Sequence, residues 1–283
     1  MAEQGNAAKG QIMVSTGFPD YKKPPVVEVA IAVQFAPLRG FTAAHAGLYW
    51  HKIRAEFGQA EEQAPIPPMS EPASPEEVEP ASVFTFGKPP MPRLWFIDST
   101  STRIIQVQHD KFIHNWRKMN PGDKYPRFDE IRENFLKYWA GFIEFLEKNR
   151  LPKPDINQCE LTYVNRMKKS EGWNSMPDLE NMFTTFVWKT RSGFLPPPDN
   201  VQWGLHFSLP EKWGRLHVQM VPVRLPPENE QAIHLVLTAR GRPEGTIDLK
   251  AMNKWFDLGH EWIVKGFADI VDKKTDSLWE KQA

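Results

Sequence analysis

The stretch Val26-Val27-Glu28-Val29-Ala30-Ile31-Ala32-Val33-Gln34-Phe35 alternates between two kinds of side chain from Glu28 onward. Successive side chains of a β-strand point to opposite faces of the sheet. One face therefore receives the large apolar residues Val29, Ile31, Val33 and Phe35, while the other receives Glu28, Ala30, Ala32 and Gln34. We predict a half-buried strand whose apolar face packs on a core.

The residues that follow predict the order β-α-β-β-β-α for the first half of the chain. Apolar residues recur at helical spacing after Thr42, which can cap a helix that ends at Gly58. Three short strands are predicted at 94–98, 103–108 and 111–117, and a long helix at 129–149. Residues 59–92 are rich in proline and acidic side chains, and we predict a loop there, without strand or helix.

The second half shows the same order of predicted elements. A strand is expected at 157–165, a helix at 178–190, strands at 201–208, 215–223 and 233–240, and a closing helix at 248–271. Aligning the halves places Glu28 against Glu160 and Arg103 against Arg215. We predict an α+β fold of two tandem β-α-β-β-β-α units, each an antiparallel sheet covered by helices on one face.

This pattern predicts three parts of the chain. Residues 1–24 form a flexible tail, because they are small, polar and aperiodic. Residues 25–150 form the first unit, which contains the acidic, proline-rich insert 59–92. Residues 151–283 form the second unit.

Composition narrows the classes of function. Thirty-five Lys and Arg balance 35 Asp and Glu, so the formal net charge is zero and the general attraction to nucleic-acid phosphates is missing. The single cysteine, Cys159, excludes internal disulfides and zinc sites built from several thiolates, and it favours a reducing compartment. No apolar run is long enough to span a membrane, and the first residues lack the apolar centre of a signal peptide. We predict a cytoplasmic protein with no membrane contact.

Catalytic motifs are absent from the sequence. It has no P-loop, no G-x-G-x-x-G after a strand, no G-x-S-x-G and no H-E-x-x-H. His260-Glu261 lacks the second histidine of a zinc helix, and Cys159 lies in an apolar strand where a buried thiol is inert. The sequence therefore favours a non-catalytic protein and predicts neither cofactor nor metal.

Polar side chains on one face of the predicted strands are the candidate site. Alternation places His206, His217, Gln219, His234 and Glu160 on one face of the second unit. It places Gln106, Gln108, Asn115, Arg117, Glu28 and Gln34 on the corresponding face of the first. We select as contact residues Gln106, Gln108, Asn115, Arg117, Glu160, Tyr163 and Asn165.

Four interpretations of these faces remain open. The first is the solvated side of an antiparallel sheet, and the second is a binding surface for a protein or small ligand. The third is the active site of a metal- or carboxylate-dependent hydrolase in which Glu28 or Glu160 acts with the histidines. A nucleic-acid-binding saddle is the fourth, because Trp95, Phe112 and Trp116 are of the type that stacks on bases.

Several stretches resemble one bacterial protein family. They are Pro24-Pro25-Val26-Val27-Glu28-Val29, Arg93-Leu94-Trp95-Phe96-Ile97, Arg103-Ile104-Ile105-Gln106-Val107-Gln108, Phe112-Ile113-His114-Asn115-Trp116-Arg117 and Asn157-Gln158-Cys159-Glu160-Leu161-Thr162-Tyr163-Val164-Asn165. The family has about this length, is distributed sporadically and has no established activity, so no catalytic residues carry over. Sporadic distribution implies horizontal transfer, which is common among defence and toxin–antitoxin systems. We therefore expect a binding or regulatory protein that acts through protein contacts, as an accessory component of such a system.

Overall fold

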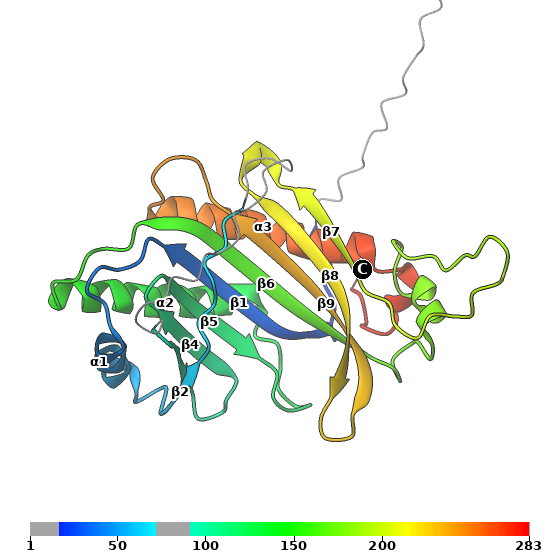
Figure 1. The fold of residues 1–283 in the computed structure, drawn as a ribbon, viewed down its shortest axis with the longest axis horizontal. Coiled ribbons are helices and arrows are strands. Elements are labelled where there is room, and N and C mark those ends of the chain that lie inside the picture. Colours follow the sequence, from blue (N-terminus) through cyan, green and yellow to red (C-terminus); the bar gives the residue numbers. More distant parts are fainter. Residues whose placement is uncertain (1–16, 72–90, 283) are drawn as a thin grey trace, which may run out of the picture.

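The computed structural model describes residues 17–71 and 91–282. Its described strands form one nine-stranded antiparallel sheet in the order β2-β3-β4-β5-β1-β6-β9-β8-β7 (Figure 1). The sheet is continuous because β1 (Val26–Phe35) pairs with β5 (Lys111–Arg117) on one side and with β6 (Ile156–Lys168) on the other. Both halves of the chain therefore contribute to the same sheet.

The remaining strands extend the sheet outward from this centre. Beyond β5 lie β4 (Arg103–Gln108), β3 (Arg93–Ile97) and β2 (Gln59–Gln63). Beyond β6 lie β9 (Glu230–Gly241), β8 (Arg215–Leu225) and β7 (Trp203–Ser208). Neighbouring strands are antiparallel throughout.

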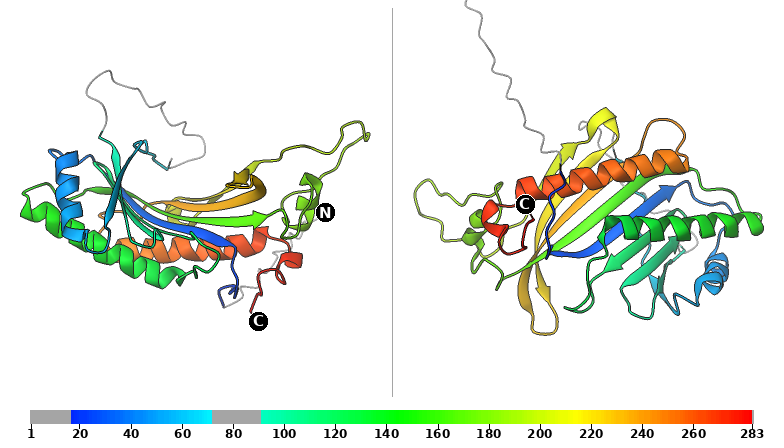
Figure 2. Two further views of the ribbon diagram at one scale, coloured as in Figure 1. Left: turned by 90° about the horizontal axis from the view of Figure 1, so that it is seen from below. Right: turned by 180° about the vertical axis from the view of Figure 1, so that it is seen from behind.

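Two long helices cover one face of the sheet. Figure 2 shows α2 (Arg127–Lys148) and α3 (Leu249–Ile270) on the same side, while the shorter α1 (Ala43–Ile53) lies near the end of α2. Apolar residues at helical spacing face the sheet from α2, among them Phe135 and Phe142, and from α3, among them Trp255 and Phe256. They pack on the apolar side of the strands, including Ile31 of β1. We call the opposite side of the sheet the open face.

Three predictions about the fold need correction. The sheets of the two expected units are one sheet, and an internal duplication of the chain is not confirmed. Residues 59–63, predicted as loop, form β2, the edge strand that pairs with β3, because the prolines of this region begin only at Pro65.

The predicted helix at 178–190 is also wrong. A short 3-10 helix, Met176–Asn181, stands at its start. The chain then turns to pair with the end of α3, where Phe183 bridges to Val271 and the N–H of Thr184 donates to the carbonyl of Ile270 at 2.8 Å. These tertiary hydrogen bonds replace those that a continued helix would make.

The predicted tail and insert are described only in part. Residues 1–16 of the tail and 72–90 of the insert lie outside the described residues. Within 17–24, Tyr21 is buried and forms a bridge with Lys281 near the other end of the chain. The predicted boundary at residue 150 falls between α2 and β6 and stays a prediction.

Candidate functional site

The strand register places five of the seven selected contact residues on the open face. Gln106, Gln108, Asn115 and Arg117 come from β4 and β5, and Glu160 comes from β6. The other two, Tyr163 and Asn165, lie on the helix side of β6 and are 4% and 3% exposed. They line a separate cavity at the N-terminal segment.

Gln106 and Asn115 belong to a chain of hydrogen bonds across the open face. The side-chain amide of Asn115 donates to Glu28 at 2.6 Å, and its oxygen accepts from Gln106 at 2.6 Å. The oxygen of Gln106 in turn accepts from Arg93 at 2.6 Å and from the indole of Trp95 at 3.0 Å. Burial raises the pKa of Glu28, against the opposing effects of Asn115, Arg117 and Arg166. This chain orders one end of the face.

Arg117 and Glu160 have partners within the protein as well. The guanidinium of Arg117 donates to the carbonyl of Ser101 at 2.8 Å and lies 5.8 Å from the centre of the Trp95 ring. Glu160 accepts from Arg240 on the neighbouring strand β9 at 2.6 Å. The contact residues selected from sequence are thus spread over two faces and over several separate hydrogen-bonded groups.

A segment of the chain itself crosses the open face. It comprises residues 64–71, which we call the docked segment, and it runs in front of the sheet in Figure 1 as the cyan coil that follows β2. Gln108 accepts from the main-chain N–H of Ile66 at 2.9 Å and donates to the carbonyl of the same residue at 2.9 Å. Gln34 does the same with Met69, accepting at 3.0 Å and donating at 2.9 Å.

A third glutamine completes the set. Gln158 at the start of β6 accepts from the N–H of Glu71 at 2.9 Å and donates to the carbonyl of Met69 at 2.8 Å. Three side-chain amides thus contact the main chain of the docked segment in the way that an adjacent strand would, one donor and one acceptor at a time. All three glutamines are buried.

The prolines of the docked segment fit this arrangement. Proline has no main-chain N–H to donate. The N–H groups that the glutamines accept come from Ile66, Met69 and Glu71, and the residues between and before them include Pro65, Pro67 and Pro68. The glutamine oxygens therefore meet positions where an N–H is present.

An ion pair anchors the far end of the docked segment. Glu71 has a side chain 6% exposed and contacts Arg215 of β8 at 2.7 Å and His217 at 2.7 Å. Burial alone raises the pKa of Glu71, but the hydrogen bonds and charges of His217 and Arg215 outweigh it, so the pKa lies below its usual value. Glu71 is therefore ionised at neutral pH, opposite an arginine.

The residues considered for acid–base or metal chemistry are dispersed. The rings of His206 and His217 lie 4.6 Å apart, but His217 contacts Glu71, and His234 accepts from Arg166 at 3.2 Å. Among residues 17–71 and 91–282, no three His, Cys, Asp or Glu side chains are placed to hold a metal ion. Burial raises the pKa of Cys159 to about 12, so its thiol stays protonated at neutral pH.

Five residues of this site escaped the sequence-based selection. Two of them, Gln34 and His217, were placed on the predicted polar faces but not selected as contact residues. Gln158 shares its strand face with Glu160, so the alternation that selected Glu160 contained the signal for it. Arg215 was noted only as the counterpart of Arg103. Glu71 lies in a proline-rich stretch, where no periodicity indicates which side chain faces the protein.

No protein-family model and no curated protein matches this chain. The bacterial family that the sequence resembles therefore remains an expectation. None of the helices in the described part of the chain has the length and apolar character needed to cross a membrane.

Proposed function

We propose that this protein is a non-catalytic binding protein whose open face holds an extended, acidic, proline-containing segment of a partner protein. The observation that carries the proposal is the contact of Gln34, Gln108 and Gln158 with the main chain of the docked segment. The docked segment then acts as a built-in occupant that the partner segment replaces.

Main-chain contacts of this kind suit peptide recognition. A peptide that adds to a sheet is held by its N–H and C=O groups, and its side chains supply the specificity. Here the three glutamines accept the N–H groups, and they tolerate proline wherever no N–H is required. A proline-containing peptide also loses less conformational entropy on binding, because its backbone is already restricted.

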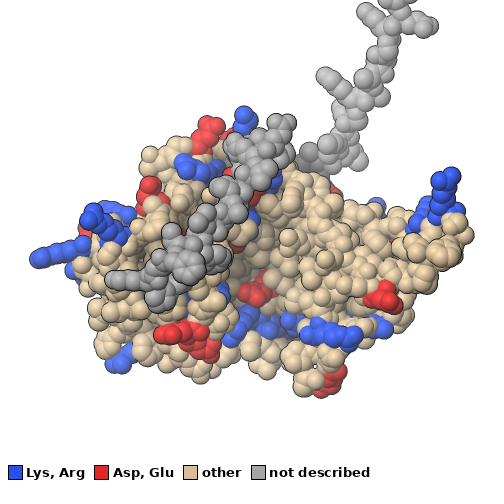
Figure 3. All heavy atoms as spheres, in the orientation of Figure 1, with Lys and Arg blue, Asp and Glu red and all other residues tan. Residues whose placement is uncertain are grey.

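The charge of the open face favours an acidic partner. On the described strands of this face, basic side chains outnumber acidic ones: Arg93, Lys111, Arg117, Arg166, Lys168, Arg215 and Arg240 oppose Glu28, Glu61, Glu160 and Glu230. Figure 3 shows both kinds on this side of the molecule. Opposite charge attracts a partner and sets its register, as Glu71 does against Arg215 and His217.

The docked segment belongs to the same chain as the open face, so it competes strongly with a partner segment for binding. A tethered segment acts at an effective concentration in the millimolar range for a short flexible connection. A partner segment must therefore bind more tightly than the docked segment, or bind after it has been released. The test therefore compares the native protein with a variant in which the docked segment is released.

The test measures binding of a labelled peptide with the sequence of residues 63–71 to the full-length protein by fluorescence anisotropy. The double variant Met69→Pro/Glu71→Gln removes the N–H that Gln34 accepts and the charge that Arg215 contacts, so it releases the docked segment. We expect this variant to bind the peptide with micromolar affinity and the native protein to bind it at least about tenfold more weakly. Pro67→Ala is the matched control, because Pro67 makes no hydrogen bond with the glutamines, and it should behave like the native protein.

Two further variants locate the binding. Gln108→Ala and Arg215→Ala, each added to the released double variant, should weaken peptide binding at least about tenfold. Peptide binding that is absent from the released variant, or unchanged by both additions, would show the proposal to be wrong. A DNA duplex that displaces the peptide with strongly salt-dependent affinity would assign the face to nucleic acid instead.

Three finer expectations also stand as proposals. The strand order supports two related halves, because β5, β4 and β3 follow β1 on one side just as β9, β8 and β7 follow β6 on the other. A cytoplasmic location and an accessory role in a bacterial defence or toxin–antitoxin system rest on the single cysteine and on the family resemblance. Capture of partners from the native host with the released variant as bait tests the accessory role.

A further inference from the structure

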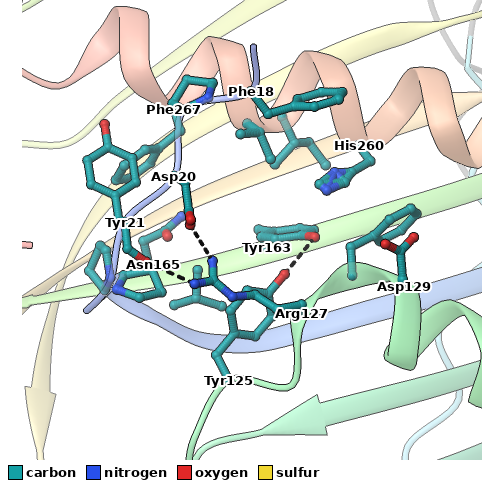
Figure 4. Close-up of a pocket in the computed structure, with 17 residues that line it drawn as sticks. Phe18, Asp20, Tyr21, Tyr125, Arg127, Asp129, Tyr163, Asn165, His260 and Phe267 are labelled. Carbon is teal, nitrogen blue, oxygen red and sulfur yellow. Dashed lines mark hydrogen bonds and ion pairs between the residues drawn. The ribbon is translucent and has the colours of Figure 1, made fainter. Parts of the chain in front are cut away.

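A second candidate site lies on the helix side of the sheet, away from the docked segment. It is a cavity of about 370 Å³, and its walls come from residues 18–26, the start of α2, the middle of β6 and the second half of α3 (Figure 4). This volume is within the range of small-molecule sites, about 300–1,000 Å³. The site is independent of the proposed peptide-binding face.

The N-terminal segment forms one wall of the cavity and is tied down on both sides. The N–H groups of Lys22 and Lys23 donate to the carbonyls of Glu280 and Trp279, each at 3.1 Å. Toward α2, the guanidinium of Arg127 donates to the carboxylate of Asp20 at 2.7 Å. These contacts hold the wall in place over the gap between α2 and α3.

Aromatic rings surround His260, a partly buried histidine in the wall of the cavity. The His260 ring lies 4.1 Å from Phe128 in an edge-to-face arrangement, 5.6 Å from Phe18 and 6.0 Å from Tyr163. Its Nδ1 atom is buried and has no hydrogen-bond partner among the described residues. A buried polar nitrogen without a partner is costly, and a ligand that hydrogen-bonds to it after the ring turns toward the cavity removes that cost.

The two tyrosines of the cavity, Tyr125 and Tyr163, carry no charge. The hydroxyls of Tyr125 and Tyr163 lie 3.0 Å apart, so one donates its hydrogen to the other. The hydrogen of the accepting hydroxyl is free to donate to a ligand. Burial raises the pKa of Tyr125 to about 12 and lowers the pKa of His260 to about 4. Both tyrosines and the histidine are thus uncharged at neutral pH.

The charged side chains that line the cavity are paired with one another or with neighbours. Arg127 contacts Asp20 at 2.7 Å, and Asp129 contacts Arg132 at 2.9 Å. A charged ligand would lose its hydration in this apolar cavity and would have to compete for a counter-ion that is already engaged. The lining therefore selects against ionised ligands.

We propose that this cavity binds a small, uncharged aromatic molecule whose polar edge hydrogen-bonds to His260 and to the Tyr125–Tyr163 pair. The ring of the ligand packs against Phe18, Phe128 and Phe267, where edge-to-face contacts are available. The rings and the unpartnered nitrogen supply the affinity, and the absence of an unpaired charge in the described lining sets the selectivity.

The test titrates the full-length protein with four probes by calorimetry and ligand-observed NMR. Indole and 4-methylphenol are uncharged aromatic molecules with a polar edge, indole-3-acetate adds a charge to the same ring, and toluene lacks the polar edge. We expect saturable, one-to-one binding of indole and 4-methylphenol. Indole-3-acetate should bind at least about tenfold more weakly because of the uncompensated charge.

Variants place the binding in the cavity. Val264→Trp fills the cavity from α3 and should abolish binding, while Leu249→Trp, at an exposed position of the same helix, should leave it unchanged. His260→Phe keeps a ring but removes the nitrogens, so it should weaken indole about tenfold and leave toluene unaffected. His260→Phe keeps the test decisive if Val264→Trp does not fold.

Three outcomes would overturn the proposal. They are the absence of saturable binding by indole and 4-methylphenol, equal affinity for indole and indole-3-acetate, and indole binding that is unchanged by His260→Phe.

Discussion

Replacement of Glu71 by glutamine tests how the docked segment is held on the open face. Glu71→Gln keeps the size of the side chain and removes its charge. The native carboxylate contacts Arg215 and His217, each at 2.7 Å. A hydrogen bond to a charged group contributes about 1.5–3 kcal/mol, and glutamine retains one acceptor for one of the two partners. We therefore expect the docked state to lose about 1.5–3 kcal/mol in total.

Amide hydrogen exchange measures this loss directly. The N–H groups of Ile66 and Met69 are protected by Gln108 and Gln34 only while the segment is docked. Local opening that is easier by about 1.5–3 kcal/mol makes their exchange about 10- to 150-fold faster. Glu62→Gln, at an exposed position of β2, is the matched control and should leave both rates unchanged. Identical rates in the native protein and Glu71→Gln would refute the reasoning, because the ion pair would then contribute nothing to docking.

The same contact predicts a dependence on pH. The pKa of Glu71 is lowered in the docked state, so its contribution is complete above the usual carboxyl range and is lost as the pH falls through the lowered value. Exchange at Ile66 and Met69, corrected for its intrinsic pH dependence, should accelerate in acid in the native protein. In Glu71→Gln this acceleration should be absent.

Two further predictions concern the stability of the fold. His114 is buried with neither ring nitrogen hydrogen-bonded in the described structure, and burial lowers its pKa to about 3. The unfolded chain therefore takes up a proton below about pH 6.5 that the folded chain resists, so native stability should fall between about pH 6.5 and 3, by at most about 5 kcal/mol. His114→Phe should remove the part of this dependence that comes from His114, leaving the part from His260, whose pKa is also lowered, and should stabilise the protein at pH 7 by about 1 kcal/mol in urea unfolding; an unchanged slope against pH would contradict the assignment. Gly241→Ala should destabilise the protein by at least about 2 kcal/mol, because a Cβ at Gly241 would lie 2.0 Å from the carbonyl oxygen of Trp213. Gly47→Ala, in open space on α1, is its control and should stabilise by about 0.5–1 kcal/mol; equal effects of the two substitutions would argue against the close approach of the two backbones.

Local periodicity predicted most elements of this fold. The alternation of 26–35 and 215–223 and the helical spacing of 129–149 and 248–271 correspond to β1, β8, α2 and α3 within a few residues. Such patterns are readable because each strand and helix has one apolar face against a core. The helix expected at 178–190 does not form, because hydrogen bonds to the end of α3 outweigh a weak local helix preference.

The candidate site was predictable only where it follows strand alternation. Period-2 alternation placed Gln106, Gln108, Asn115, Arg117 and Glu160 on one face. The selection of Tyr163 and Asn165 beside Glu160 ignored that alternation, and both lie on the helix side. The partner of the open face was hidden from the sequence, because the docked segment has no regular secondary structure and reaches the sheet from a distant part of the chain.

By itself, the sequence determined which residues form most of the strands and the two long helices, and which face of these strands is apolar, because these properties depend on side chains a few positions apart. Tertiary structure alone decided that β1 and β6 join both halves into one sheet, and that Gln34, Gln108 and Gln158 meet residues 64–71. It also decided that residues 18–26 close a cavity against α3. These contacts join residues far apart in the chain, and their free energy depends on burial and on partners that only the folded protein brings together.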